Sequence, residues 1–452
     1  MACKDVFIVY GAGVSGRGAV EVLAGKGKKV FLYNDNPCTI EPELEAAMAK
    51  AGGALVIGRD NYEALLEEAG TLVLSPGIPC DGEQVLLAEA KGLEVISEVE
   101  LGYRSYGGHI VGITGTNGKT TTTSLVGELL KTLPVPSAMG GNIGLALSKE
   151  VEHLPAQGWL AAELSSFQLE KVVSFKADIA AILNLTPDHL ERHHTMEAYG
   201  EAKMNIFRNQ GPEQITILNY DDPILRDWNK ETKGQVCYFS RKVLLEEGIF
   251  MQDGNFMIKW KGETHKVCHI DEVLLFGGHN EENMLAAIGC AYFAGVTIEN
   301  MAKVLKSFKS IEHRIEYVNT IKGVPYYNDS KATNTDSTIK ALEAFPKGHV
   351  ILLAGGHDKM TPLEPMMELV KEKCDLLILL GEAKERFNEA AVACGVKNIV
   401  VVDSFKEAVQ VAYANAKEPQ VVLLSPACSS YDMFNNYPER GRYFKALVNA
   451  LA

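Results

Sequence analysis

The sequence predicts an α/β protein of three domains, each a mostly parallel sheet with flanking helices. Short apolar runs alternate along the chain with stretches of helical spacing, a pattern typical of βαβ units. Glycine-rich turns follow two of the apolar runs, and the alternation resumes in the last third of the chain. The 452 residues suit about three domains, which we place at 1–98, 99–310 and 311–452.

The composition is that of a folded protein without an obvious nucleic-acid partner. Apolar residues make up 46% of the chain, and 44 basic against 58 acidic side chains give a net charge of −14. This balance argues against nucleic acid but not against an anionic small molecule, which needs only local donors. The nine cysteines form no C-x-x-C pair, so we expect a reduced, cytoplasmic protein. No signal peptide and no membrane span are expected.

The first predicted domain opens with a strand, a glycine turn and a helix. The apolar run 5–10 precedes a G-x-G-x-x-G motif at 11–16, and a second strand at 29–33 ends at Asp35. This is the dinucleotide-binding fingerprint, in which glycines let a phosphate approach a helix N-terminus. Taken alone it indicates NAD.

This first domain ends after one mononucleotide-sized half. Strands are expected at 72–74 and 94–96, and the unit stops near Glu98. The segment Ser75-Pro76-Gly77-Ile78 follows a strand, where loops meet a ligand in such sheets, although a simple Pro-Gly turn explains it as well. A complete NAD domain would need a second half before any other site.

The clearest motif is a P-loop in the second predicted domain. A strand at 110–113 leads into a turn of small residues at 114–118, followed by Lys119, Thr120 and a helix. Backbone N–H groups and the helix dipole surround a phosphate in such a turn. Lys119 adds positive charge and Thr120 offers a hydroxyl to Mg²⁺. The usual motif has glycine where this chain has Ile113.

Polar residues follow the next two predicted strands. The strand 159–164 carries Glu163, and the strand 179–185 leads to His189. An acid and a histidine above a parallel sheet suit a metal. His193 lies four residues after His189, but no further spaced ligand completes a zinc set. We therefore expect His193 and His194 to be solvated polar residues.

The remainder of the second domain gives fewer signals. A polar glycine loop is expected at 140–144, a helix at 196–207 that carries Lys203, and a hairpin with strands at 249–251 and 256–258. His279 and Asn280 open an Ala-rich helix at 283–294. Residues 226–270 suggest no function.

The third predicted domain has polar clusters at the ends of its strands. Strands are expected at 324–327, 350–353, 376–380, 399–402 and 421–424. The clusters occupy 328–334, 355–359 and 425–428, and each alone could be a capped loop. Because the carboxyl ends of parallel strands share one edge, the three together indicate a binding edge.

Taken in order along all three units, these motifs resemble those of the Mur ligases. The matching strings are Thr-Gly-Thr-Asn-Gly-Lys-Thr at 114–120, Gly-Asn-Ile-Gly at 141–144, Glu-Leu-Ser-Ser at 163–166, His189, His313-Arg314, Asn-Asp-Ser-Lys-Ala-Thr-Asn at 328–334 and Ser-Pro-Ala at 425–427. The family's own P-loop spacing accounts for Ile113. The string at 328–334 resembles most the members that add D-glutamate, and the Asp-Asn-Pro-Arg string of the diamino-acid-adding members is missing.

The resemblance implies a Rossmann-like first domain, a central P-loop ATPase domain and a Rossmann-like third domain. It implies an ATP-dependent ligase that adds D-glutamate to the L-alanine carboxylate of UDP-N-acetylmuramoyl-L-alanine through an acyl phosphate, giving ADP and phosphate in peptidoglycan precursor synthesis. Its partners would then be small-molecule substrates, and we expect a monomer.

The resemblance also implies roles for individual residues. The catalytic residues would be Lys119, Glu163, His189 and Lys203. Two Mg²⁺ ions would be held by Thr120, Glu163, His189 and a CO₂-derived carbamate on Lys203. ATP would contact Gly115, Thr116, Asn117, Gly118, Lys119, Thr120, Thr121, Asn280, Arg314 and Asp329. The UDP-substrate would contact Ser15, Asp35, Asn36, Ser75, Gly77 and Asn142. D-Glutamate would contact Lys331, Thr333, Lys359, Ser425 and Phe434.

Three other functions remain open on the sequence. A sibling ligase, such as a folate polyglutamylating enzyme or another muramyl ligase, would share the P-loop and the metal residues. An NAD-dependent oxidoreductase would use the glycine motif at 11–16 with Asp35, but it leaves the P-loop, Glu163 and His189 without a role. A nucleotide-gated binding module without turnover leaves Lys203 and the clusters of the third domain unexplained.

Overall fold

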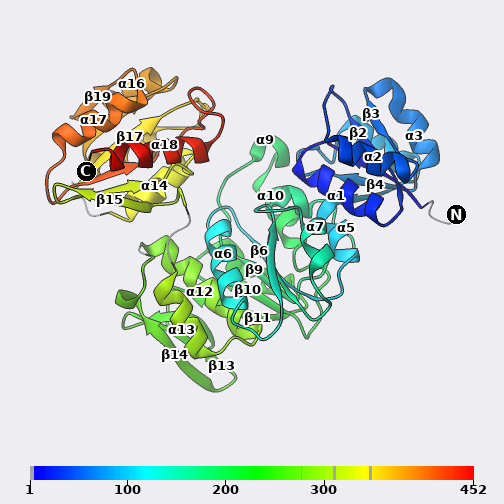
Figure 1. Ribbon diagram of the computed structural model, residues 1–452. Helices are drawn as coiled ribbons and strands as arrows, with labels where there is room; N and C mark the ends of the chain where they lie inside the picture. The colour runs from blue at the N-terminus through cyan, green and yellow to red at the C-terminus, as the bar shows by residue number, and fades with distance from the viewer. Residues whose placement is uncertain (1–4, 276, 309–311, 346–348, 452) are drawn as a thin grey trace. The chain divides into compact units, whose positions relative to one another are not determined.

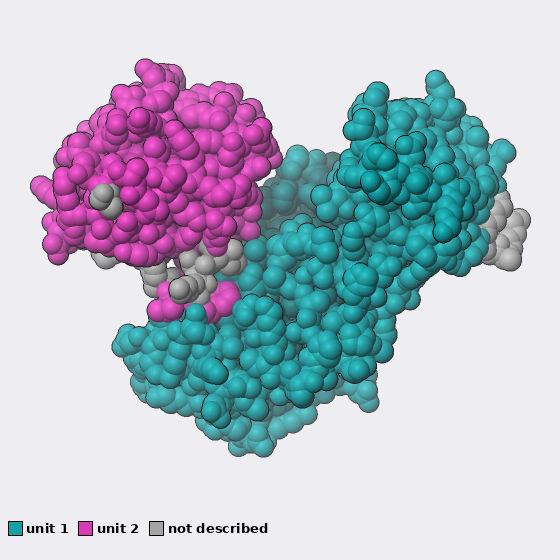
Figure 2. All heavy atoms as spheres, in the orientation of Figure 1, with its two compact units in different colours: residues 1–273, 282–307 teal, residues 274–281, 308–452 magenta. Residues whose placement is uncertain are grey.

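The computed structural model describes residues 5–275, 277–308, 312–345 and 349–451 (Figure 1). The described chain forms two compact units, shown in different colours in Figure 2. The first contains Met1–Val273 with Glu282–Ser307, and the second contains Leu274–Glu281 with Phe308–Ala452. The expected α/β class with mostly parallel sheets is confirmed. The division into three domains stays a prediction, and its limit at 310/311 lies outside the described residues.

The first sheet is parallel and has the strand order β3-β2-β1-β4-β5. Its strands are β1 (Val6–Tyr10), β2 (Lys29–Asn34), β3 (Leu55–Ile57), β4 (Thr71–Leu74) and β5 (Glu94–Ser97). The helices are α1 (Val14–Gly25), α2 (Pro42–Lys50), α3 (Tyr62–Glu68), α4 (Glu83–Ala90) and α5 (Glu98–Arg104). Strand β3 was not expected, because its three residues are too few to show a period.

Both faces of the first sheet are buried by helices. Ile8 packs with Tyr62 of α3 and Val85 of α4, whereas its neighbour Val9 packs with Val20 of α1 and helix α2 on the other face. Successive side chains of a strand point to opposite faces. The apolar run 5–10 is continuous for this reason: a strand covered on both sides has no solvent face.

The second sheet, in the same compact unit, has the strand order β14-β13-β12-β11-β10-β9-β6-β8-β7. Its strands are β6 (His109–Thr114), β7 (Ser137–Gly141), β8 (Trp159–Glu163), β9 (Ile179–Ile182), β10 (Ile215–Asn219), β11 (Gln235–Ser240), β12 (Gly248–Gln252), β13 (Asn255–Trp260) and β14 (Glu263–His269). The P-loop strand β6 lies between β8 and β9, parallel to both. The hairpin of β12 with β13 is confirmed.

Several helices accompany this sheet. They are α6 (Lys119–Leu130), α7 (Leu147–Glu150), α8 (Ser166–Leu169), α9 (Leu190–His193), α10 (Met196–Met204), α11 (Pro223–Asp227), α12 (Gly278–Phe293) and α13 (Ile298–Ser307). The expected loop at 140–144 was wrong in its first residues, because Gly140 and Gly141 continue β7 in register with β8. Residues 226–270 contribute mainly to the sheet, from β11 to β14.

Helix α5 joins the first two sheets through buried carboxylates. Oε1 of Glu98 accepts a hydrogen bond from the backbone N–H of Ser148 at 2.7 Å. Glu100 accepts from the backbone N–H groups of Val173, Ser174 and Phe175, each at 2.9 Å. Backbone donors on a buried carboxylate compensate its desolvation, so α5 is held against the loops of the second sheet.

The third sheet lies in the second compact unit and has the order β15-β16-β20-β17-β18-β19. Its strands are β15 (Glu316–Ile321), β16 (Val324–Asn328), β17 (Val350–Gly355), β18 (Cys374–Leu380), β19 (Ile399–Val401) and β20 (Val421–Leu424). Only β15 pairs antiparallel in this described sheet, and it was not expected. The helices are α14 (Thr335–Glu343), α15 (Glu364–Lys373), α16 (Lys384–Cys394), α17 (Phe405–Asn415) and α18 (Tyr437–Asn449).

Short 3₁₀ turns complete the described structure at Arg59–Asn61, Val151–His153, Trp228–Lys230 and Ile270–Glu272. Of the helices in the described part of the chain, none is long and apolar enough to cross a membrane.

Candidate active site

The P-loop lies at the carboxyl end of β6 and requires its glycines. Gly115 has φ +151° and Gly118 has φ +84°, values that residues with a Cβ rarely adopt. A Cβ on Gly118 would lie 2.2 Å from Oδ1 of Asn283, and one on Gly115 would lie 3.0 Å from Cβ of Leu183. The turn therefore brings its backbone close to its neighbours, and α6 begins directly after it.

Asn184 holds this turn from the neighbouring strand. Its Oδ1 accepts from the backbone N–H of Asn117 at 2.8 Å, and its Nδ2 donates to the Asn117 carbonyl at 3.2 Å. The Thr116 hydroxyl donates to the Thr186 carbonyl at 3.1 Å. Asn184 was not predicted as a site residue, although its place just after β9 is the signal that could have identified it.

The Lys119 ammonium lies over the P-loop itself. Its Nζ donates to the carbonyls of Gly115 and Thr116, both at 2.9 Å. Thr120 follows in the first turn of α6 and is partly exposed. Thr121 is buried, and its hydroxyl has no hydrogen-bond partner among the described residues. A lysine at a helix N-terminus suits a phosphate group.

Glu163 ends β8, directly beside the P-loop strand. It pairs in register with Ile113 and is only 2% exposed. Its Oε1 accepts a hydrogen bond from Nδ2 of Asn142 at 2.8 Å. Its Oε2 is buried without a hydrogen-bond partner in the described structure. A buried carboxylate oxygen left in this state is unfavourable unless a cation binds it.

Lys203 projects from α10 to the same turn and is 1% exposed. Its Nζ donates to the Gly115 carbonyl at 2.9 Å and lies 4.5 Å from the centre of the Tyr199 ring. Burial holds the pKa of Lys203 well below its ordinary value, and the nearby Lys119 ammonium lowers that pKa further. The site thus favours an uncharged amine at this position.

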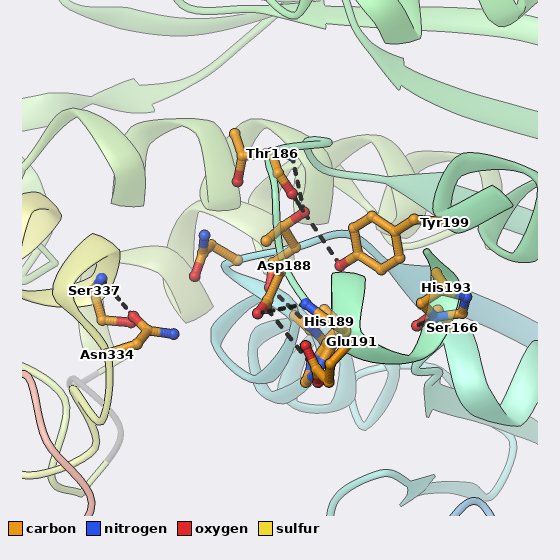
Figure 3. A network of polar contacts seen from close by, with 12 residues as sticks. Ser166, Thr186, Asp188, His189, Glu191, His193, Tyr199, Asn334 and Ser337 are labelled. Atoms are coloured by element: carbon orange, nitrogen blue, oxygen red, sulfur yellow. Dashed lines mark hydrogen bonds and ion pairs between the residues drawn. The ribbon is translucent and has the colours of Figure 1, made fainter. Parts of the chain in front are cut away.

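His189 lies just before α9, about half exposed, and has a left-handed backbone with φ 53°. Its ring nitrogens lie 3.6 Å from Oδ2 of Asp188 and 3.5 Å from Oε1 of Glu191, as Figure 3 shows. The ring meets the edge of Phe167 at a centroid distance of 4.9 Å.

The expectation for His193 was wrong. Its side chain is buried, with Nε2 2.9 Å from the Ser166 hydroxyl and Nδ1 3.5 Å from Oε1 of Glu170. Figure 3 shows His193 beside Ser166. The ring also stacks on Phe167, and burial lowers its pKa. The histidine lies on the side of α9 that packs against α8. A helix of only four residues is too short for its buried side to be recognised from the sequence. His194 is exposed, as expected.

The donor set fits Mg²⁺ better than a soft metal. The described residues contain no group of three or more His, Cys, Asp and Glu side chains arranged for a metal ion. The expected ligands instead combine the Glu163 carboxylate and His189 with the Thr120 hydroxyl and Lys203. The unpartnered Oε2 of Glu163 is the observation that fits a hard cation.

Two of the residues expected at the UDP-substrate, Ser75 and Asp35, make hydrogen bonds at the glycine turn of the first sheet or at the end of β1. Ser75 is buried and its hydroxyl donates to the Gly11 carbonyl at 2.9 Å. Asp35 accepts from the hydroxyls of Tyr10 and Tyr33, the latter at 2.7 Å. Ser15 lies in the first turn of α1. In the described structure the Asn36 carbonyl accepts from Nδ2 of Asn34, whereas the Asn36 side chain makes no hydrogen bond.

A cavity of about 390 Å³ adjoins this turn. It is lined by the glycine turn at 12–14, by Arg17 and by Leu145, Ala146 and Lys149, which follow β7. Asn142, in the same loop after β7, reaches Glu163. The first and second sheets therefore contribute jointly to this part of the site.

In the second compact unit, Asp329 follows β16 and is 4% exposed. Its Oδ2 accepts from the Ser425 hydroxyl at 2.8 Å, and its Oδ1 accepts from the Ile315 N–H at 3.3 Å. Burial raises the pKa of Asp329 to about 7. A small cavity beside it is lined by residues that include His279, Arg314 and Lys331. Asn280 is buried at the start of α12.

The three polar clusters of this unit follow β16, β20 and β17, which are neighbours in the sheet. Lys331 and Thr333 are half-buried and Lys359 is exposed. Ser425 is fully buried, its hydroxyl engaged with Asp329 and 3.1 Å from Oγ1 of Thr338. Phe434 packs in a ring cluster 5.4 Å from Phe405 and 5.7 Å from Tyr443. The Ser425 side chain is closed to a ligand in this arrangement, whereas Phe434 is only partly buried.

Arg440 on α18 was not predicted and connects two of these clusters. Its guanidinium is 1% exposed and donates to the carbonyls of Ser330 at 2.8 Å, Cys428 at 3.1 Å and Ser429 at 3.1 Å. It thereby fixes the loop after β16 against the loop after β20. No local pattern around residue 440 distinguishes it from an exposed helical arginine.

Two family models match the chain. The Mur ligase middle domain matches residues 113–291, and the Mur ligase glutamate ligase domain matches residues 313–428. Curated relatives match over nearly the whole chain. A UDP-N-acetylmuramoylalanine–D-glutamate ligase from Lachnoclostridium phytofermentans is 41% identical, with 98% of each chain covered. One of the same name from Caldicellulosiruptor bescii is 44% identical, covering 99% of this chain and 98% of its own.

Solved structures share the fold at low identity. A pseudomurein peptide ligase type C from Methanothermus fervidus has a TM-score of 0.61 at 18% identity, covering 99% of this chain and 100% of its own. A UDP-N-acetylmuramate–alanine ligase from Thermotoga maritima has a TM-score of 0.60 at 16% identity, with the same coverage. A MurF ligase from that organism, solved in complex with ADP, has a TM-score of 0.57 at 19% identity, covering 87% of this chain and 92% of its own.

Proposed function

The chain belongs to the Mur ligase family, and we propose that it joins D-glutamate to the L-alanine carboxylate of UDP-N-acetylmuramoyl-L-alanine. The proposal takes its substrates from the names of relatives that are 41% and 44% identical over nearly the full chain. The structural observation that carries it is the cluster at the end of β6. There Lys119, the unpartnered oxygen of Glu163 and the buried amine of Lys203 meet around one phosphate-binding turn.

The first chemical step activates the substrate carboxylate, which by itself is a poor electrophile. An oxygen of the substrate carboxylate attacks the γ-phosphorus of ATP, the bond to the bridging oxygen breaks and ADP leaves. Both partners are anions, so the step needs concentrated positive charge in a closed site. Lys119 and the backbone donors of the P-loop supply it from this chain. Mg²⁺, when bound by Thr120, Glu163 and His189, would neutralise the phosphate oxygens.

The second step forms the amide. The uncharged amine of D-glutamate attacks the acyl carbon, the bond from this carbon to the phosphate oxygen breaks, and the extra amine proton passes to the departing phosphate or to water. We assign Lys331, Thr333 and Lys359 to the amino acid, because their loops follow β16 and β17, the two strands that flank β20. Ser425 supports this edge indirectly, by orienting Asp329 through their 2.8 Å hydrogen bond. Phe434, partly buried in the segment after β20, remains a proposed contact of D-glutamate.

Lys203 is the residue that we propose to carry a carbamate. CO₂ adds only to an uncharged amine, and the lowered pKa of Lys203 favours that form. The product would present carboxylate-like oxygens, the ligands that Mg²⁺ prefers.

The remaining assignments concern ATP and the UDP-substrate. We assign the phosphates of ATP to the turn Gly115–Gly118 with Thr121, and the rest of ATP to Asn280, Arg314 and Asp329. We assign the UDP portion to Ser15, Asp35, Asn36, Ser75 and Gly77, of which Ser75 donates to the Gly11 carbonyl of the glycine turn. Asn142, hydrogen-bonded to Glu163, would meet the muramyl-peptide end.

Phosphate release with a panel of amino acids tests the proposal. The protein is mixed with ATP, Mg²⁺ and UDP-N-acetylmuramoyl-L-alanine, and D-Glu, L-Glu, L-Lys or meso-diaminopimelate is added in turn. We expect release with D-Glu alone. Release with L-Lys or meso-diaminopimelate instead would assign the chain to a sibling activity. Release that does not depend on the UDP-substrate would contradict the ligase function.

A further inference from the structure

Arg192 on α9 reaches from the second sheet into a loop of the first. Its Nη1 donates to the Pro76 carbonyl at 3.0 Å, and its Nη2 donates to the Ile78 carbonyl at 2.9 Å. These two carbonyls bracket Gly77 in the loop after β4. Both sheets lie in the same compact unit, so the contact is internal to that unit.

Arg192 also contacts Glu170 and Phe167 on the side of the second sheet. Nη2 also donates to Oε2 of Glu170 at 2.5 Å, and the guanidinium lies 4.4 Å from the centre of the Phe167 ring. The side chains of Arg192 and Glu170 are only 14% and 10% exposed. A largely desolvated, charge-assisted contact of this kind is strong and directional. The planar guanidinium can donate to two carbonyls and a carboxylate at once, which a lysine ammonium cannot match in geometry.

The two segments that Arg192 connects belong to opposite ends of the proposed substrate. The loop after β4 begins with Ser75, whose hydroxyl donates to Gly11 in the turn assigned to the UDP portion. On its own side, Arg192 lies three residues after His189, which is assigned to the reacting end. His193, the next residue, shares the Glu170 carboxylate, with Nδ1 3.5 Å from Oε1.

We propose that Arg192 is a positioning residue that fixes the separation between the UDP-binding loop and the reacting end of the site. This inference rests on the proposed function, because the two ends are defined by that substrate. Arg192 acts through the carbonyls of Pro76 and Ile78 and through α9, without contacting the substrate. A ligand that spans both ends gains the affinity of the second contact only when the two ends are already correctly spaced.

The test compares a ligand that spans the site with a ligand that does not. UDP alone and UDP-N-acetylmuramoyl-L-alanine are titrated by calorimetry into the wild type and into Arg192→Met, which keeps an apolar side chain over Phe167 but removes its donors. The readout is the affinity for UDP-N-acetylmuramoyl-L-alanine divided by the affinity for UDP. A general loosening of the UDP loop would lower both affinities alike and leave this ratio unchanged. We expect this ratio to fall at least about tenfold in Arg192→Met, because preorganisation is lost.

Arg226 provides a matched control. It lies 4.6 Å from the centre of the Tyr220 ring and donates to the Tyr220 carbonyl at 3.0 Å, in a part of the same unit with no proposed site residue. Arg226→Met should leave the affinity ratio unchanged. Arg192→Lys should give an intermediate ratio, since an ammonium can keep the Glu170 contact but cannot bracket the loop.

A second variant keeps the test informative if Arg192→Met is unstable. Glu170→Gln leaves both hydrogen bonds from Arg192 to the loop in place but weakens the contact between Arg192 and residue 170. It should therefore lower the same ratio. In both variants we expect the KM for the UDP-substrate to rise more than the KM for ATP. An unchanged affinity ratio, with only the melting temperature lowered, would show that Arg192 is merely structural and would overturn the proposal.

The outcome separates the two proposals. Phosphate release by the wild type that depends on D-glutamate is measured first. If the wild type shows none, the proposed function fails before Arg192 is tested. If the wild type is active and the affinity ratio is the same in Arg192→Met as in Arg226→Met, the positioning role alone is contradicted.

Discussion

The side-chain amide of Asn142 donates to Oε1 of Glu163 at 2.8 Å, while Oε2 of the same carboxylate is buried without a hydrogen-bond partner among the described residues. A buried carboxylate with a hydrogen-bond partner on only one of its two oxygens, next to a P-loop, is suited to bind a cation through the other oxygen. The same contact brings the loop expected at the muramyl-peptide end next to Glu163, a proposed Mg²⁺ ligand.

Glu163→Gln should therefore weaken the dependence of the reaction on Mg²⁺. Loss of one preorganised electrostatic group costs roughly two to three orders of magnitude in kcat, and the Mg²⁺ concentration for half-maximal rate should rise. Asp178→Asn is a suitable control. Its carboxylate accepts from the Ile110 N–H near the start of β6, the strand whose other end leads into the P-loop. If Glu163→Gln keeps the wild-type Mg²⁺ dependence, Glu163 is not a ligand.

Lys203 should react reversibly with CO₂. The protein is equilibrated with ¹³C-bicarbonate, and a carbamate carbon signal in the NMR spectrum is expected in the wild type and not in Lys203→Ala. The variant should lose nearly all ligation, and acetate or formate should restore part of it by entering the vacated space. Lys203→Arg should not be rescued, since guanidinium stays cationic. An equal signal in wild type and Lys203→Ala would assign the carbamate elsewhere.

Lys359→Ala should raise the KM for D-glutamate. Loss of one charge-assisted contact to a carboxylate costs roughly 1.5–3 kcal/mol, or about 10- to 150-fold, while ATP binding should hardly change. Lys371→Ala removes another exposed lysine of the same unit, one that contacts Glu368 at 3.4 Å, and should have no effect. A fall in ATP affinity with an unchanged KM for D-glutamate would mean that the pocket is misplaced.

The glycine turn of the first sheet should bind UDP and not NAD. Calorimetry should give heat with UDP-N-acetylmuramoyl-L-alanine and none with NAD⁺ or NADH, because we assign this turn to the UDP portion of the substrate. The described sheet itself has five strands in the order β3-β2-β1-β4-β5, so the expectation of a single mononucleotide-sized half was wrong. Asp35→Ala should weaken binding of the UDP-substrate. Micromolar binding of NAD⁺ that disappears in Asp35→Ala would restore the oxidoreductase interpretation.

The sequence was most informative where a strand leads into a turn that only glycine allows. The P-loop strand, its helix and Glu163 were placed correctly, because buried parallel strands are continuous apolar runs. The short strand β3 and the antiparallel edge strand β15 were missed, since the first has only three residues and the second has a mixed burial pattern.

Contacts between distant segments could not be predicted. The burial of His193 depends on Ser166 and Glu170 of another helix segment, and the roles of Asn184, Arg192 and Arg440 are defined by backbone carbonyls and amides far away in the sequence. Ser425 shows the same limit. Its place at a strand end was predicted, whereas its burial against Asp329 depends on how β20 pairs with β16.

The most direct test of activation through an acyl phosphate follows the oxygen atoms of the substrate. UDP-N-acetylmuramoyl-L-alanine labelled with ¹⁸O in both carboxylate oxygens is incubated with the protein, ATP, Mg²⁺ and D-glutamate, and the released phosphate is analysed by mass spectrometry. Activation through an acyl phosphate predicts that each phosphate carries one ¹⁸O and that its release requires D-glutamate. Unlabelled phosphate, or release in the absence of the UDP-substrate, would contradict the account.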